Sequence, residues 1–168
     1  MKRRILLVDD DLAVLLTLKA VLELHEFEVD TAVGTAEAFA RMESGVYHMV
    51  ISDLHMETEN AGLEVIRAAH RQSYAPATAL LTAIPPSDEH WDGRGSSEEG
   101  SQEKDSFGDG SSAKRPAEDR PDSLLVKPVG TSDLVRQIEA LLIRHADKQE
   151  LLQRITASRT QLRNRSAG

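Results

Sequence analysis

Polar side chains follow four of the predicted apolar strands, at the point where each strand ends. Asp9 and Asp10 follow the first strand, Asp53 the third, Thr82 the fourth and Lys127 the fifth. The carboxyl ends of the strands in an open parallel α/β sheet line one crevice, so we expect these side chains to converge there.

The residue types at this predicted crevice suit a metal-assisted phosphoryl reaction. Carboxylates that face one another repel, and a divalent cation or an ammonium group relieves the repulsion. A few carboxylates, a backbone carbonyl and water suit Mg²⁺, whereas the chain has no cysteine and its six histidines are scattered without ligand spacing. A carboxylate, a metal, a hydroxyl and a lysine together supply the nucleophile, the neutralising charge and the hydrogen bonds of phosphoryl transfer.

The elements that position these residues alternate between strand and helix. Short apolar runs predict strands at residues 5–8, 27–33, 48–52, 77–81 and 124–126. Helical spacing predicts helices at residues 12–25, 36–42 and 63–69, and another that begins near Thr131 and continues to about Leu162. Thr35 is the expected N-cap of the second helix, and Gly45 its end. Right-handed crossovers then predict a doubly wound α/β fold, with a five-stranded parallel sheet and helices on both faces.

Charge and composition divide the chain of 168 residues into unequal parts. Residues 86–123 contain 11 Asp and Glu against 5 Lys and Arg, five of the ten glycines and eight serines. Such a composition buries too little apolar surface to offset its ordering entropy, which predicts a disordered acidic insertion with Trp91 and Phe107 as its docking points. We therefore expect a domain at residues 1–144 that carries this insertion, and a basic helical or frayed tail at 145–168.

The same composition excludes several classes of protein. A net charge of -8 excludes a uniformly basic nucleic-acid binder, and the absence of cysteine excludes a disulfide framework. No apolar run approaches the roughly 20 residues of a membrane helix. We expect a cytoplasmic protein without membrane insertion.

Four motifs, in order, resemble the receiver domain of bacterial two-component response regulators. They are Ile5-Leu6-Leu7-Val8-Asp9-Asp10, Ile51-Ser52-Asp53-Leu54-His55-Met56, Leu80-Leu81-Thr82-Ala83 and Leu125-Val126-Lys127-Pro128. The resemblance covers residues 2 to about 85 and 124 to about 144. It implies a flavodoxin-like sheet with strand order 2-1-3-4-5. Because the tail after Arg144 is short, we expect a stand-alone receiver without an output domain.

The resemblance also implies a role for each site residue. Asp53 would accept phosphate from the phosphohistidine of a histidine kinase or a phosphotransfer protein. Mg²⁺ would be held by Asp10, Asp53 and the backbone carbonyl of His55, with Asp9 acting mostly through bound water. The chain would be a phosphoacceptor signalling protein and not an enzyme beyond its own phosphorylation and dephosphorylation.

Two further residues would act on the phosphate itself. Thr82 would donate a hydrogen bond to the aspartyl phosphate. Lys127, oriented by a cis bond to Pro128, would pair with it. Phosphorylation would then bias a pre-existing two-state surface, read by an unknown downstream protein.

Three departures from the family pattern predict local differences. Glu57 stands where the family usually has proline, with a route to Gly62 that is one residue longer, and Leu124 replaces the usual aromatic residue. The acidic insertion occupies the place of the family's fourth helix. The tail is too short for a helix-turn-helix unit, so we expect no direct DNA binding, while a homodimer stays open.

Other interpretations of the same residues also stay open. Asp9, Asp10 and Asp11 could serve only to cap a helix, and each remaining site residue has an ordinary structural explanation when taken alone. A degenerate receiver that binds partners without phosphorylation is one alternative. A haloacid dehalogenase-like phosphohydrolase, with Asp9 as nucleophile and Asp11 as acid, is another.

Overall fold

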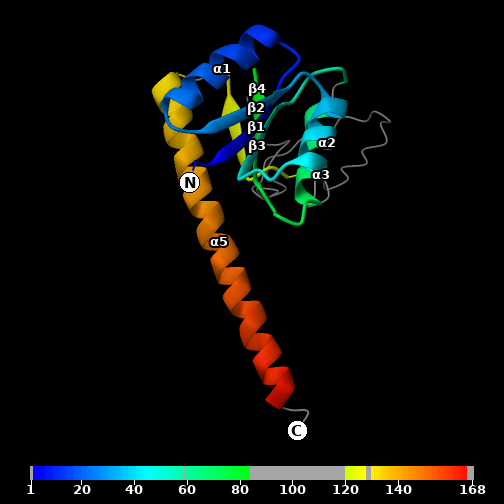
Figure 1. The fold of residues 1–168 in the computed structure, drawn as a ribbon, viewed down its shortest axis with the longest axis vertical. Coiled ribbons are helices and arrows are strands. Elements are labelled where there is room, and N and C mark those ends of the chain that lie inside the picture. The colour runs from blue at the N-terminus through cyan, green and yellow to red at the C-terminus, as the bar shows by residue number, and fades with distance from the viewer. Residues whose placement is uncertain (1, 59, 84–119, 128–129, 166–168) are drawn as a thin grey trace, which may run out of the picture.

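The computed structural model describes residues 2–58, 60–83, 120–127 and 130–165. Its five strands form one parallel sheet in the order β2-β1-β3-β4-β5. The strands are β1 (Arg4–Val8), β2 (Glu28–Ala32), β3 (Met49–Asp53), β4 (Ala77–Thr82) and β5 (Ser123–Val126). The helices are α1 (Leu12–Leu24), α2 (Thr35–Ser44), α3 (Ala61–His70) and α5 (Thr131–Arg165) (Figure 1). The predicted doubly wound fold and its 2-1-3-4-5 order are confirmed; the predicted loss of a fourth helix concerns residues outside the described ones.

Helices cover both faces of the sheet, because the interior strand β1 is apolar on both sides. Ile5 and Leu7 of β1 join the core beneath α1 and α5, whereas Leu6 and Val8 join the core beneath α2 and α3. All four side chains are fully buried. Alternation of side chains along a strand therefore accounts for the two helical layers in Figure 1.

The sheet register brings the polar strand ends to one edge. Val8 pairs with Ser52, so Asp9 lies level with Asp53. Asp53 pairs with Leu81, the residue before Thr82. The predicted convergence follows from this register and from the parallel direction of all five strands.

The start of α2 differs from the prediction. The helix begins at Thr35, preceded by Gly34, and Gly34 makes no side-chain capping bond. Thr35 is therefore not a local N-cap. Its amide and its hydroxyl instead donate to Glu57 Oε1, at 2.7 and 3.0 Å. The prediction was wrong because the capping carboxylate comes from another loop.

The strand after the acidic segment, β5, begins one residue earlier than predicted. Ser123, placed by the sequence in the insertion, is the first residue of β5. The preceding Asp122 carboxylate accepts bonds from the Thr78 amide at 2.9 Å and the Thr78 hydroxyl at 3.1 Å. These bonds attach the chain to β4 two residues ahead of the apolar run, which begins at Leu124.

Helix α5 is one continuous element of 35 residues that projects beyond the sheet (Figure 1). Its first turns bury Leu134 and Ile138 against the sheet, while Leu151 and Ile155 further along are exposed. The predicted continuation toward Leu162 is confirmed. Among the described residues, no helix combines the length and the apolar character needed to cross a lipid bilayer.

Gly62 allows the first turn of α3 to approach the end of β3. A Cβ there would collide with the Asp53 carbonyl oxygen and lie 2.8 Å from Leu54 Cα. Backbone atoms cannot rotate away, so Gly62→Ala should lower the free energy of unfolding by about 1–3 kcal/mol. Urea unfolding measures the change. Gly130→Ala is the control, because its added Cβ would lie 3.5 Å from Asp133 Oδ2, an ordinary contact; equal losses in the two variants would contradict this account.

Candidate phosphoacceptor site

The structure gathers the predicted acidic residues at the carboxyl edge of the sheet. Each of Asp9, Asp10 and Asp53 offers a carboxylate oxygen, and these oxygens lie within 4.8 Å of one another. No other such group of His, Asp or Glu residues exists in the part of the chain that the structure describes. Asp9 is 1% exposed and Asp53 8% exposed, whereas Asp10 is open to solvent. The cluster is therefore desolvated on one side and accessible on the other.

Lys127 compensates the two buried carboxylates. Its Nζ lies 2.8 Å from Asp9 Oδ2 and 2.8 Å from Asp53 Oδ1. Burial alone lowers the pKa of Lys127, but the hydrogen bonds and charges of Asp53 and Asp9 outweigh it and raise the pKa above its usual value. The ammonium therefore stays charged at neutral pH.

Backbone amides fix the remaining oxygens of the two buried carboxylates. The amide of Asp11 donates to Asp9 Oδ1 at 2.9 Å, and the amide of His55 donates to Asp53 Oδ2 at 3.1 Å. Each carboxylate is thus held between Lys127 and one amide. Asp11 itself is the N-cap of α1, where its carboxylate accepts the amide of Ala13 at 2.8 Å.

Thr82 and Lys127 lie side by side through the β4–β5 ladder. The Lys127 amide donates to the Thr82 carbonyl at 2.7 Å, and Thr82 is 2% exposed. The neighbouring Leu81 carbonyl accepts the amide of Leu54, the residue after Asp53, at 2.9 Å. Both predicted phosphate-contacting residues therefore belong to the edge that carries Asp53. The predicted cis bond to Pro128 lies outside the described residues.

The donor set of this edge fits a hard divalent cation. The three clustered groups are carboxylates, and oxygen ligands are those that Mg²⁺ prefers. The chain has no cysteine thiolate, the sulfur ligand that would favour a softer metal. The residues present thus fit a Mg²⁺ site that is completed by backbone carbonyl or water.

Leu124 occupies the position of the expected family aromatic residue. It is partly buried and packs against the cluster of Leu63, Ile66 and Leu80. The side chain thus contributes to the apolar contact between β5 and α3 and brings no ring or hydroxyl.

Sequence reasoning missed the contact between Glu57 and Thr35. Glu57 was noted only for its difference from the family pattern. Its partner lies 22 residues away in the chain. A pair that far apart has no periodic signal, so only the three-dimensional arrangement reveals it.

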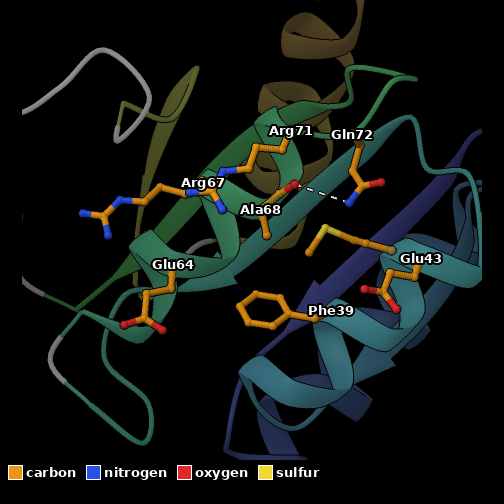
Figure 2. A pocket seen from close by; sticks show the side chains of 8 residues that line it. Phe39, Glu43, Glu64, Arg67, Ala68, Arg71 and Gln72 are labelled. Atoms are coloured by element: carbon orange, nitrogen blue, oxygen red, sulfur yellow. Dashed lines mark hydrogen bonds between the residues drawn. The ribbon is translucent and has the colours of Figure 1, made fainter.

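A separate groove lies between α2 and α3 (Figure 2). Phe39, Met42 and Ala68 form its apolar part, and Glu43 and Arg71 are among the charged side chains around it. Its volume is about 400 Å³. None of the residues at the acidic edge lines it, so the groove is not part of the predicted site.

Comparison with known proteins settles the family. The response regulator receiver domain family matches residues 5–89, slightly more than half of the chain. The chain belongs to this family. No curated protein sequence matches it significantly.

Solved structures agree with the fold of this receiver. The Vibrio cholerae chemotaxis protein CheY4 is 19% identical with a TM-score of 0.63, covering 84% of this chain and 99% of CheY4. Response regulator TrrA of Thermotoga maritima, solved in complex with Mg(2+)-BeF, is 25% identical with a TM-score of 0.59, covering 83% and 98% of the two chains. A Rhodopirellula baltica structure described as adenylate cyclase is 27% identical with a TM-score of 0.63, covering 91% and 98%.

Removal of the Lys127 ammonium should expose the repulsion between Asp9 and Asp53. Lys127→Ala should lower the free energy of unfolding by about 1–3 kcal/mol, below the full cost of breaking a buried ion pair because Lys127 is partly exposed. Mg²⁺ should restore part of the loss, since a cation again faces the carboxylates. Urea unfolding in EDTA and in Mg²⁺ measures both effects.

The control is Lys19→Ala, which removes a surface pair with Glu23 at 3.6 Å. Its loss should stay within about 0.5 kcal/mol and should not respond to Mg²⁺. If Lys127→Ala loses as little stability as this control and does not respond to Mg²⁺, the Lys127 ammonium does not offset repulsion between Asp9 and Asp53.

Proposed function

We propose that this receiver is a phosphoacceptor response regulator that is phosphorylated on Asp53. The observation that carries the proposal is the position of the Asp53 carboxylate, which lies beside Asp9 and Asp10 and 2.8 Å from Lys127 Nζ. This arrangement provides a nucleophilic oxygen, a metal-ligand set and a fixed cation at one point.

The transfer would proceed from a phosphohistidine of a histidine kinase or phosphotransfer protein. An Asp53 carboxylate oxygen attacks phosphorus, the new P–O bond forms as the P–N bond breaks, and the electron pair returns to the donor's imidazole nitrogen. Lys127 and the Thr82 hydroxyl would stabilise the charge on the equatorial phosphoryl oxygens.

The oxygen ligands around Asp53 suit Mg²⁺. Asp10, Asp53 and the His55 carbonyl would hold Mg²⁺ directly, and the buried Asp9 would act through water. When bound, Mg²⁺ neutralises charge that builds up on the phosphoryl oxygens. The similar TrrA was solved in complex with Mg(2+)-BeF, which supports a Mg²⁺ site in this receiver.

Residues 1–144 would form the receiver proper, and residues 145–168 a basic helical or frayed tail. Phosphorylation would act in the cytoplasm through contact with a downstream protein or through onward phosphate transfer, without direct DNA binding. A homodimer is compatible with this scheme.

Two alternative functions, a phosphohydrolase and a degenerate receiver, require different residues at the site. A phosphohydrolase would need Asp9 as an accessible nucleophile and Asp11 as an acid, but Asp9 is 1% exposed against 8% for Asp53, and Asp11 caps α1. These features disfavour it. A degenerate receiver is favoured by Leu124, which cannot act as an aromatic switch.

Beryllofluoride with Mg²⁺ separates these functions in proton–nitrogen NMR spectra. The wild type should show shifted amides around Asp53, and Asp53→Asn should abolish them because the acceptor oxygen is lost. Asp9→Asn should keep at least part of the response. No response in the wild type would indicate the degenerate receiver, and loss only in Asp9→Asn would indicate the phosphohydrolase.

His55 offers a further test of the same site. The His55 amide donates to Asp53 Oδ2, and the His55 side chain is exposed. The imidazole is therefore close enough to affect water near an acyl phosphate on Asp53. His55→Ala should change the rate of autodephosphorylation by a few-fold, measured by loss of the phosphoryl group after the donor is removed. Equal rates in variant and wild type would reject this role.

A further inference from the structure

Glu57 links the loop after β3 to the start of α2. Its Oε1 accepts the Thr35 amide at 2.7 Å and the Thr35 hydroxyl at 3.0 Å. Helix α2 has no side-chain cap of its own from Gly34. The carboxylate therefore satisfies a first-turn amide and lies at the positive end of the helix dipole.

Gly34 makes this close approach possible. A Cβ added at Gly34 would lie 2.5 Å from Glu57 Oε1 and 3.1 Å from its Cδ. The backbone of Gly34 is extended, with φ of 178°, so the glycine is not needed for its dihedral angle. The missing side chain leaves space for the carboxylate.

The tethered loop segment carries groups of the proposed site. His55 lies two residues before Glu57, and its amide fixes Asp53 Oδ2 at 3.1 Å. Its carbonyl is the expected third oxygen ligand. The Leu54 amide ties the start of the segment to β4 through the Leu81 carbonyl at 2.9 Å, but within the segment Met56 donates to the Thr58 carbonyl at 3.4 Å. The Glu57 contact is shorter and reaches a separate helix.

We propose that Glu57 is a positioning residue for Mg²⁺ binding, which acts by fixing the segment from Leu54 to Thr58 against α2. The inference rests on the proposed function, because it concerns the carbonyl expected to complete the metal site. A ligand on a pre-ordered loop binds more tightly than one that must be ordered at the moment of binding. Glu57 touches neither the metal nor the phosphate in this scheme.

Glu37 provides a matched control on the same helix. Its Oε2 accepts the Val33 amide at 3.0 Å, and its Oε1 pairs with Arg41 at 3.0 Å. Glu37, like Glu57, thus satisfies a backbone amide at the start of α2. It makes neither of these bonds to the loop after β3, so Glu37→Ala loosens the helix start and leaves that loop attached.

The experiment compares the full chain with Glu57→Ala, Glu57→Gln and Glu37→Ala. Titration calorimetry gives the Mg²⁺ dissociation constant, thermal unfolding gives Tm, and hydrogen exchange in metal-free protein follows the His55 and Thr35 amides. Glu57→Ala should weaken Mg²⁺ binding about fivefold, the order expected from losing a pre-ordered ligand, and should speed exchange at both amides. Glu57→Gln should stay within about twofold of wild type, because its amide oxygen still accepts both bonds.

Glu37→Ala should lower Tm without changing the Mg²⁺ dissociation constant. Equal Mg²⁺ affinity in Glu57→Ala and wild type would overturn the positioning role, as would an equal loss in Glu37→Ala. If the wild type itself binds no Mg²⁺, the proposed function fails and the positioning role fails with it. Unchanged affinity in Glu57→Ala beside normal binding in the wild type removes the Glu57 inference alone.

Discussion

The contact of one ammonium with two buried carboxylates is the interaction on which the site depends. Asp9 and Asp53 lie almost out of solvent, and Lys127 Nζ is 2.8 Å from both. Without a cation the carboxylates would repel in a poorly solvated environment. Lys127 is 118 residues from Asp9 in the chain, so the pairing of β4 with β5 is what delivers the charge.

Two kinds of structure position the residues at this edge, the sheet and the loop after β3. Asp9, Asp53 and Thr82 stand at or next to the ends of buried strands whose register fixes their separation. The loop after β3 is held by the Leu54 amide on the Leu81 carbonyl, by Glu57 on Thr35 of α2 and by the close approach of Gly62 to the end of β3. Strands thus set the positions of the charges, while the loop positions the His55 amide that donates to Asp53 Oδ2.

Much of this arrangement is predictable from the sequence, because it follows from short-range patterns. Apolar runs of parallel strands, helical periodicity and polar residues at strand ends gave the fold class and the five converging residues. Strand order came from the resemblance of the motifs. What escaped prediction depends on long-range contacts: Glu57 capping Thr35 from another loop, and Asp122 starting β5 early through Thr78. The different roles of Asp9, which pairs with Lys127, and Asp11, which caps α1, were not predictable either, because neighbouring aspartates at a helix start have the same sequence pattern.

The central claim is that Asp53, and no other carboxylate of the cluster, carries the phosphoryl group. Borohydride reduction after incubation with acetyl phosphate and Mg²⁺ converts an acyl phosphate to an alcohol at the modified residue, and peptide mass spectrometry locates it. The account predicts reduction at residue 53 only, and none when Mg²⁺ is chelated. Reduction at Asp9, or a protein left unmodified in the presence of Mg²⁺, would contradict it.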